Sequence, residues 1–326
     1  MRIVSGAAAL AAARASGAAG APLAVAIGNF DGVHLGHQVL LAEARRRAER
    51  SGGSSAVLTF TPHPARLFAP EKAPPLIMSL ARRLELCAAA GIEVAIVEPF
   101  SHAFAAIEAD AFVRDVLRRD LDARDVVVGY DFSFGRGRTG NARRLAALGT
   151  ELGFGVAVIP PVAVGDLACS STKIRELVSA GRTLEAAQLL GRAFEIEGRV
   201  VRGAARGQKL GFPTANVVPE GELVPKLGIY AARARLLDGP AAGAVHPVAL
   251  SVGRNPTFAG PAGQGGISVE AHLLDFDGDL YDRRLRLEIG ERLRDEQRFD
   301  SIPELVAQIQ ADVERVRGLS LPAVEP

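Results

Sequence analysis

Two histidines near the start of the chain have the spacing of an anion-binding motif. His34 and His37 flank Gly36, and they follow an apolar run at residues 23–27 and a glycine-containing turn at residues 28–32. Apolar residues at helical spacing come next, which places both histidines at the start of a predicted helix. Imidazoles three residues apart share one helix face, and the N–H groups and positive dipole of a helix N-terminus attract phosphate. This context favours a phosphate site over a solvated or capping pair of histidines.

A second cluster of polar side chains lies at residues 170–175, which read Ser-Ser-Thr-Lys-Ile-Arg. It places three hydroxyls and two cations at the start of another predicted helix. Simple N-capping needs one hydroxyl and no cation, so the cluster predicts a second anion site. The Ser-x-x-Lys spacing also fits serine acyl-transfer enzymes, but no Ser-Asp-Asn or Lys-Thr-Gly stretch accompanies it, and we discard that match.

A basic glycine loop at residues 135–140 fits the dinucleotide-binding pattern G-x-G-x-x-G. It follows the fifth predicted strand instead of the first, and no acidic residue lies about twenty positions further on. Beside Asp131 and the aromatic residues Tyr130, Phe132 and Phe134, the loop could hold a flat ring that carries a phosphate. Equally, the aromatic side chains could belong to the core and the arginines to solvent.

The second half of the chain contains another candidate phosphate loop at residues 203–210. Its glycines and cations are Gly203, Arg206, Gly207 and Lys209. Such a loop can wrap phosphates although no Walker sequence is present. The Gly-Phe-Pro-Thr-Ala-Asn segment that follows puts oxygens of Thr214 and Asn216 on one side of an extended strand, which suits Mg²⁺ shared with phosphate. The alternative is a turn with local side-chain hydrogen bonds.

Strict alternation of residue types at residues 267–273 predicts a strand with two distinct faces. Ser268, Glu270 and His272 share one face, and aliphatic residues share the other. A catalytic Glu270 and an ordinary solvent-facing surface account for this pattern equally well. The acidic stretch at residues 275–279 resembles a calcium loop, but its glycine stands at the fourth position instead of the sixth. We therefore expect a hairpin turn there.

Hydrophobic periodicity predicts the elements that position these residues. Residues 1–21 form a short strand and helix, and further strands are expected at residues 23–27, 56–60, 94–97, 126–128 and 156–159. Predicted helices at residues 80–90, 109–118 and 170–180 come between or after these strands. Strands that alternate with helices predict an α/β fold with a parallel, Rossmann-like sheet.

Beyond Gly191 the hydrophobic period changes from helical to alternating. Strands are expected at residues 194–201, 229–236, 247–252, 267–274 and 284–289. This pattern predicts a small antiparallel β-barrel or sandwich, with a glycine-rich loop at residues 259–266. A capping box at residues 301–304 begins a C-terminal amphipathic helix. We therefore expect two domains, at residues 1–184 and 185–326.

Composition and charge narrow the possible classes of protein. The 326 residues are 48% hydrophobic and 23% charged, which excludes a disordered chain. Lys and Arg number 38 against 37 Asp and Glu, so we expect neither nucleic acid nor a membrane as partner. No stretch is long and apolar enough to span a bilayer. Cys87 and Cys169 stand far apart, which opposes disulfides and zinc and suits a reducing cytoplasm.

Residues 28–37, Gly-Asn-Phe-Asp-Gly-Val-His-Leu-Gly-His, together with residues 170–175, resemble the FMN adenylyltransferase module of bacterial bifunctional flavin kinases and FAD synthetases. This module belongs to the nucleotidyltransferases with an H-x-G-H motif. The resemblance implies that His34, His37 and Arg175 act on the ATP phosphates. It implies that the ATP site also contains Gly28, Asn29, Phe30, Asp31, Ser171 and Thr172. It further implies that His63, in a Thr-Pro-His-Pro loop, and Asp131 lie near the flavin.

The C-terminal segments resemble the riboflavin kinase barrel in the same order, and the Gly-Phe-Pro-Thr-Ala-Asn segment carries most of this resemblance. It implies that Thr214 and Asn216 bind Mg²⁺ and ATP phosphate. Glu270 would be the base that deprotonates the ribityl 5′-hydroxyl, and Arg294 and Phe299 would hold the flavin. Residues 202–205 read Arg-Gly-Ala-Ala where family members often have His-Gly-Asp-Gly, a departure that bears on nucleotide contacts and not on the fold.

The resemblance implies two sequential reactions, with riboflavin, FMN and ATP as substrates and FMN and FAD as products. Two alternatives remain. An H-x-G-H motif also serves ATP in aminoacyl-tRNA synthetases, but no Lys-Met-Ser-Lys-Ser stretch is present. The barrel could bind nucleic acid through Arg199, Arg202, Arg206 and Lys209, but the chain has no Trp and only 5% aromatic residues for base stacking.

Overall fold

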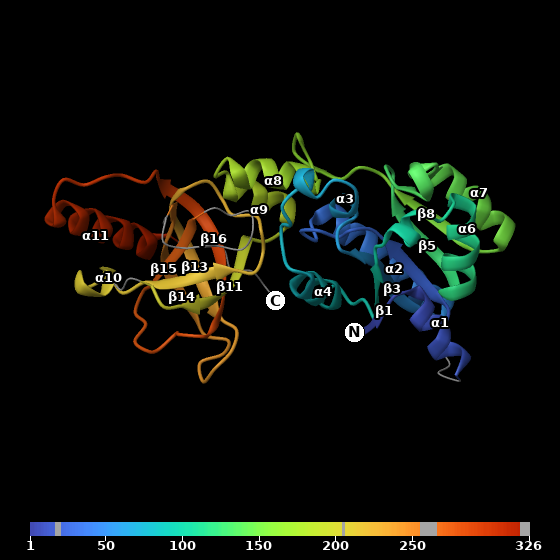
Figure 1. The fold of residues 1–326 in the computed structure, drawn as a ribbon, viewed down its shortest axis with the longest axis horizontal. Helices are drawn as coiled ribbons and strands as arrows, with labels where there is room; N and C mark the ends of the chain where they lie inside the picture. The colour runs from blue at the N-terminus through green and yellow to red at the C-terminus, as the bar shows by residue number, and fades with distance from the viewer. Residues whose placement is uncertain (17–20, 204–205, 255–265, 320–326) are drawn as a thin grey trace. The chain divides into compact units, whose positions relative to one another are not determined.

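The structure is a computed structural model, and it describes residues 1–16, 21–203, 206–254 and 266–319 (Figure 1). The chain divides into two compact units, Met1–Pro74 with Leu80–Cys169 and Pro75–Ser79 with Ser170–Pro326. Since the second unit begins again at Ser170, it includes the predicted helix at residues 170–180 together with the C-terminal strands. Except for Gly266, the predicted glycine-rich loop lies outside the described residues. The expected boundary at residue 184 stays a prediction.

A six-stranded parallel sheet forms the centre of the first unit. Its order is β1 (Arg2–Ser5), β4 (Val94–Pro99), β3 (Ser54–Thr61), β2 (Leu23–Ile27), β5 (Ala123–Gly129) and β8 (Gly155–Ile159). Every neighbouring pair runs parallel, which confirms the α/β prediction. The chain adds β3 and β4 on one side of β2 and then crosses to β5 on the other. In open parallel sheets a ligand crevice forms at such a switch point, outside the carboxyl ends of the strands.

Helices connect and cover these strands. They are α1 (Ala7–Ala15), α2 (Leu35–Ser51), α3 (Pro64–Phe68), α4 (Leu80–Ala89), α5 (His102–Ala105), α6 (Ala109–Ala111) and α7 (Ala142–Leu152). A π-helix, η2 (Phe112–Asp120), continues α6, so the helix predicted at residues 109–118 is present but changes its winding. Two short 3₁₀ helices are η1 (Pro70–Lys72) and η3 (Arg136–Arg138), and two short strand pairs are β6 (Ser133–Phe134) with β7 (Gly140–Asn141) and β9 (Ala163–Val164) with β10 (Leu167–Ala168).

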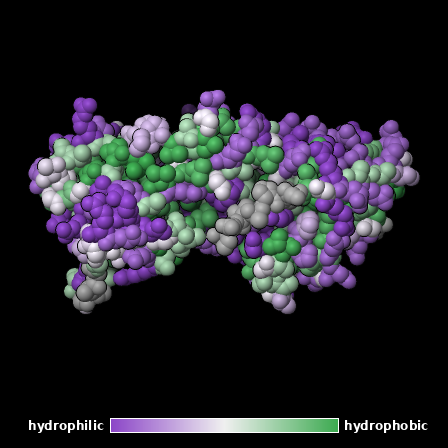
Figure 2. All heavy atoms as spheres, turned by 180° about the vertical axis from the view of Figure 1, so that it is seen from behind, coloured by the Kyte–Doolittle hydropathy of each residue, from purple (hydrophilic) through white to green (hydrophobic). Residues whose placement is uncertain are grey.

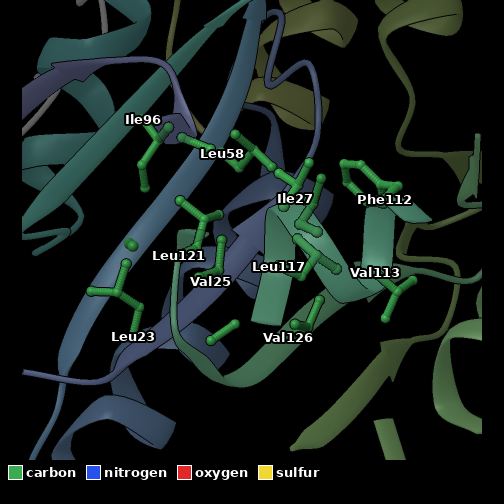
Figure 3. Packing of buried hydrophobic residues seen from close by; sticks show 14 of the residues in the cluster. Leu23, Val25, Ile27, Leu58, Ile96, Phe112, Val113, Leu117, Leu121 and Val126 are labelled. Carbon is green, nitrogen blue, oxygen red and sulfur yellow. The ribbon is translucent and has the colours of Figure 1, made fainter. Parts of the chain in front are cut away.

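Apolar side chains from the sheet and from η2 pack together on one face of the sheet (Figure 3). Val25 and Ile27 of the central strand are buried together with Val113 and Leu117 of η2. All five residues of β2 are buried, as expected for an inner strand with both faces covered. This packing fixes the end of β2, from which the histidine-containing turn begins.

A closed antiparallel barrel of six strands forms the centre of the second unit. Its order is β11 (Phe194–Val201), β12 (Ala215–Pro219), β15 (Ile267–Leu273), β14 (Val245–Arg254), β13 (Gly228–Leu236) and β16 (Arg284–Arg294), with β16 returning to β11. The barrel prediction is confirmed. The hairpin turn predicted at residues 275–279 is wrong, because β15 and β16 are separated by two strands in either direction around the barrel. A turn-like composition does not reveal which strands a loop joins.

Among the described residues of this unit, the helices are α8 (Ser171–Ser179), α9 (Thr183–Leu190), α10 (Arg206–Lys209) and α11 (Ile302–Gly318). The predicted N-cap of the last helix is confirmed, because Ser301 Oγ accepts a hydrogen bond from the N–H of Glu304 at 3.4 Å. Val313 and Val316 of α11 are buried in a cluster with Leu293.

Hydrophilic side chains cover much of the face seen in Figure 2, with hydrophobic side chains interspersed. Within the described ranges, none of the helices combines the length and the apolar character that crossing a bilayer requires.

Candidate active sites

The turn after β2 has an unusual backbone. Phe30 and Val33 adopt positive φ angles of 51° and 38°, and Gly32 between them has a φ of 91°. A left-handed conformation is costly for a bulky residue and more so for a β-branched one, so it persists only where the surroundings enforce it. Both side chains are fully buried. The packing therefore holds this turn in one strained shape directly before the histidines.

His34 and His37 are stacked at the start of α2. Their ring centroids are 3.6 Å apart with an interplanar angle of 18°. His34 Nδ1 accepts a hydrogen bond from the N–H of His37 at 3.3 Å, so a neutral His34 ring carries its proton on Nε2 and can donate it to an anion. A Cβ at Gly36 would lie 3.1 Å from the His34 ring, which explains the glycine between the histidines. The predicted helix start and histidine pair are confirmed.

A buried ion pair that the sequence analysis missed supports this turn. Asp31 and Arg83 are only 1% and 3% exposed, and Arg83 Nη2 lies 4.0 Å from Asp31 Oδ1. Arg83 Nη1 also reaches Thr59 Oγ1 at 3.5 Å, and that hydroxyl donates to the carbonyl of Asn29 at 3.2 Å. Burial lowers the pKa of the Arg83 guanidinium, and the Asp31 carboxylate acts in the opposite direction. The network ties the turn to β3 and α4.

One sequence signal could have identified Arg83. It lies on the same face of α4 as the buried residues Leu84 and Cys87, where an amphipathic helix would carry an apolar residue. Burial raises the pKa of the neighbouring Cys87 thiol to about 12, so this thiol stays protonated. A cation in such a setting is stable only with a partner, and Asp31 provides it.

The other predicted residues of the first unit follow the carboxyl ends of neighbouring strands. His63 follows β3 and caps α3, since its Nδ1 accepts a hydrogen bond from the N–H of Ala65 at 3.2 Å. Asp131 follows β5 and is exposed. Because parallel strands end at the same edge of the sheet, the fold brings both residues to the edge where the histidine turn begins.

The predicted anion site at α8 has the expected local structure. Ser170 Oγ accepts a hydrogen bond from the N–H of Lys173 at 3.1 Å, which makes Ser170 the N-cap. Arg175 Nε donates to the carbonyl of Pro75 at 2.7 Å. Leu76, the next residue, donates its N–H to Glu222 Oε2 at 3.0 Å. The helix is confirmed, whereas phosphate contacts of Ser171, Thr172 and Arg175 stay a prediction.

The basic glycine loop at residues 135–140 is part of a small hairpin formed by β6 and β7. Phe134 is buried in the core, while Arg136 is exposed and pairs with Glu108 at 2.6 Å. Arg138 Nε donates to Ser133 Oγ at 2.8 Å. The structure thus favours the core alternative for Phe134 and the solvated alternative for the arginines, whereas Tyr130 is exposed and does not belong to the core.

The predicted kinase residues converge on the outer face of the barrel. Asn216 on β12 stands directly opposite Glu270 on β15, and Ser251 on β14 stands opposite Glu270 on the other side. Val269 and Ala271 are buried, so the alternation of β15 is confirmed. Directly opposed residues on antiparallel strands point to the same face, which makes the amide and the carboxylate neighbours.

The glycine loop approaches the same residues. A Cβ at Gly203 would lie 2.2 Å from Asn216 Nδ2, and one at Gly207 would lie 2.3 Å from the carbonyl oxygen of Phe212 and 3.5 Å from Thr214 Oγ1. At Gly207 the main chain thus leaves no space for a Cβ, and at Gly203 a Cβ would displace the Asn216 amide. The side chains of Arg206 and Lys209 lie outside what the structure describes.

The donor set of this site suits magnesium. Thr214, Asn216 and Glu270 offer hydroxyl, amide and carboxylate oxygens, which are hard ligands. Mg²⁺ in phosphate-transfer sites is usually held by one or two protein oxygens, by substrate phosphates and by water. The residues present therefore fit a magnesium ion that arrives with a nucleotide.

The two predicted flavin residues of the barrel lie together. Arg294 stands over the ring of Phe299 at 6.0 Å. Its guanidinium also pairs with the buried Asp312 of α11, with Nη2 at 2.7 Å and Nε at 3.0 Å from the carboxylate. Arg294 thus holds α11 on the barrel, and its contact with a flavin stays a prediction.

Two family models match the chain. The model described as FAD synthetase matches residues 18–173, and the model described as riboflavin kinase matches residues 190–320. The bifunctional riboflavin kinases/FMN adenylyltransferases of Pseudomonas fluorescens and Escherichia coli K12 are 39% and 37% identical to the chain. Each alignment covers 91% of this chain and 93% of the relative.

A solved structure described as a macrolide-efflux protein from Streptococcus pneumoniae has a TM-score of 0.80 and 30% sequence identity. The match covers 92% of this chain and 95% of that chain. Its description names transport, whereas both family models and the curated relatives name flavin enzymes. None of these matches names an aminoacyl-tRNA synthetase or a nucleic-acid-binding protein. The chain therefore belongs to the bifunctional riboflavin kinase/FMN adenylyltransferase family.

Proposed function

We propose that the residues of this bifunctional riboflavin kinase/FMN adenylyltransferase divide between two separate ATP sites, one in each half of the chain. The barrel transfers the γ-phosphoryl group of ATP to riboflavin, and the parallel-sheet half transfers the adenylyl group of a second ATP to FMN. We place the boundary between residues 184 and 185. Both steps transfer a group directly between substrates and need no covalent enzyme intermediate.

In the kinase step, Glu270 accepts the proton of the ribityl 5′-hydroxyl as the hydroxyl oxygen attacks the γ-phosphorus of ATP, and ADP leaves as the bond from the γ-phosphorus to the bridging oxygen breaks. The supporting observations are the cross-strand pairing of Glu270 with Asn216 and the close approach of the glycine loop, since a Cβ at Gly203 would lie 2.2 Å from Asn216 Nδ2. Thr214 and Asn216 would hold the phosphate oxygens and the metal, and Gly203, Arg206, Gly207 and Lys209 would surround the phosphate chain. General-base assistance of this kind contributes about 10² to 10⁴ in rate.

Magnesium, when bound with ATP, neutralises charge on the transferred phosphoryl group. Thr214 and Asn216 would hold it. Arg294 and Phe299 lie beside each other and would support the flavin ring.

In the adenylylation step, the FMN phosphate is the nucleophile and attacks the α-phosphorus, and pyrophosphate leaves. The chain needs to align these groups and to stabilise the developing negative charge. The supporting observation is the strained, buried turn that fixes Gly28–Asp31 and delivers the stacked His34 and His37 to the N-terminus of α2. Ser171, Thr172 and Arg175 supply further triphosphate contacts, and His63 and Asp131 flank the flavin.

We also propose that the enzyme works in the cytoplasm. This rests on its two free cysteines, of which Cys87 is buried in the core.

The direct test supplies the purified chain with riboflavin, ATP and Mg²⁺ and separates the flavins by chromatography. FMN should appear first and FAD second, and omission of Mg²⁺ should stop the formation of FMN. If riboflavin stays unchanged while supplied FMN is converted to FAD, the kinase assignment is wrong.

A further inference from the structure

We propose that His272 is a positioning residue of the kinase site, which fixes the Gly-Phe-Pro-Thr-Ala-Asn segment so that Thr214 and Asn216 face Glu270. This inference rests on the proposed kinase function of the barrel. His272 is the second residue after Glu270 on the same face of β15.

The first observation is a hydrogen bond at the end of a strand pair. His272 Nδ1 lies 2.8 Å from the carbonyl oxygen of Pro213. A carbonyl oxygen can only accept, so Nδ1 carries the proton and the neutral ring is the Nδ1–H tautomer. The bond thus fixes both the tautomer and the backbone directly before Thr214.

The second observation is where the backbone ladder ends. β12 and β15 pair through Val217 with Val269, Asn216 with Glu270 and Ala215 with Ala271. The next position would place Thr214 opposite His272, but the ladder stops at Ala215. The imidazole therefore attaches the chain where the main-chain pairing has ended, at Pro213, directly before the residue that supplies the first proposed metal ligand.

The third observation links the same ring to the phosphate loop. The rings of His272 and Phe212 meet edge to face, with centroids 5.6 Å apart and an angle of 77°. Phe212 packs against the hydrophobic cluster beneath α11, and its N–H donates to the carbonyl of Gly207 at 2.9 Å. The imidazole thus contacts both Phe212, which is hydrogen-bonded to the glycine loop, and Pro213, which precedes Thr214.

His272 acts through these neighbours and not on the reacting atoms. Misplacement of a positioning element by about 1 Å can cost about 10²-fold in rate. Loss of the Pro213 contact should therefore lower the kcat/KM of the kinase by about 10- to 100-fold, with a rise in the KM for MgATP. Adenylylation of supplied FMN should not change, because its residues lie in the other half of the chain.

The test compares two variants of the full chain. His272→Leu removes the hydrogen bond, and His272→Asn keeps a side-chain N–H able to reach the Pro213 carbonyl. Ser268→Ala is the matched control, because Ser268 stands two residues before Glu270 on the same face. We expect a large kinase defect in His272→Leu, recovery of most activity in His272→Asn and parental activity in Ser268→Ala. A fully active His272→Leu, or an Asn variant as impaired as the Leu variant, would overturn the proposal.

A second measurement examines the His272 ring in the parental protein itself. Nitrogen-15 NMR of histidine-labelled parental protein reports the tautomer of each ring, and the spectrum of His272→Asn assigns the signal. The Nδ1–H tautomer is expected for His272, and an Nε2–H tautomer contradicts the proposal. A parental protein with the Nδ1–H tautomer but no kinase activity would refute the proposed function and leave the structural contact intact.

Discussion

The two ATP sites are built in different ways. In the first half, the proposed phosphate residues lie at two helix starts, one of them at the strained turn after β2 that leads straight into α2 and the other at the start of α8. In the barrel, the residues come from separate strands, and register alone brings Asn216 opposite Glu270. The first site depends on buried packing around a turn, and the second depends on a close approach between a loop and a strand. Substitutions should therefore harm each site by a different physical route.

The largest effect is expected for Glu270→Gln. The amide cannot accept the hydroxyl proton, so FMN formation should fall by about 10² to 10⁴. Conversion of supplied FMN to FAD should stay at the parental rate and serves as the internal control. Steady-state assays of the two half-reactions measure both effects. An unimpaired kinase rate would remove Glu270 from the reaction.

The next effect concerns the buried pair beside the turn. Arg83→Met leaves Asp31 without its cation, and removal of one partner of a buried ion pair typically costs about 3 to 5 kcal/mol. Thermal unfolding should show this loss, together with weaker adenylylation. The control is Arg45→Met, because Arg45 forms an exposed pair with Glu49 that should contribute less than about 1 kcal/mol. Equal stability of the two variants would show that the buried pair does not support the turn.

A smaller and more local effect is expected for Gly203→Ala. The added Cβ would meet the Asn216 amide, which has to move away from its place opposite Glu270. Because a small displacement of a positioning group can cost up to about 10²-fold, kinase kcat/KM should fall by about tenfold. Gly318→Ala is the control, because a Cβ at Gly318 would meet open space and this glycine has no positive φ. A parental kinase rate in Gly203→Ala would mean that the loop tolerates a side chain.

The smallest effect is a pH-dependent one in α2. A hydrogen bond from Arg46, with help from Arg47, lowers the pKa of Glu43 from its ordinary 4.5 to about 2. Since the folded-state pKa is lowered, the stabilisation is present above about pH 4.5 and is lost as the pH falls toward 2. Glu43→Gln should cost about 1 kcal/mol at pH 6, and this cost should shrink as the pH falls from about 4.5 toward 2, as measured by urea unfolding. A cost that does not vary with pH would contradict this assignment.

Local patterns in the sequence were sufficient for much of the architecture. The alternation of strands and helices predicted the parallel sheet, and the change of period after Gly191 predicted the barrel. The histidine pair and the α8 cap were also predictable, because helix starts are determined by nearby residues. The two faces of β15 were assigned correctly, because successive side chains of a strand point to opposite faces.

What could not be predicted depends on contacts between distant segments. The stretch at residues 275–279 has the composition of a turn, yet it joins strands that are not neighbours, since pairing is a property of the whole barrel. Arg83 and Asp31 are far apart in the sequence, and their pairing depends on the fold that buries them together. The π-helical winding of η2 likewise has no clear local signal.

The most direct test of two independent ATP sites is a mixing experiment with His37→Ala and Glu270→Gln. Each variant is incubated alone with riboflavin, ATP and Mg²⁺, and then both are combined in one reaction. His37→Ala should stop at FMN, Glu270→Gln should leave riboflavin largely unchanged, and the mixture should form FAD because FMN made by one variant is adenylylated by the other. If the mixture forms no FAD, or if either variant alone makes FAD from riboflavin at the parental rate, the division into two sites is wrong.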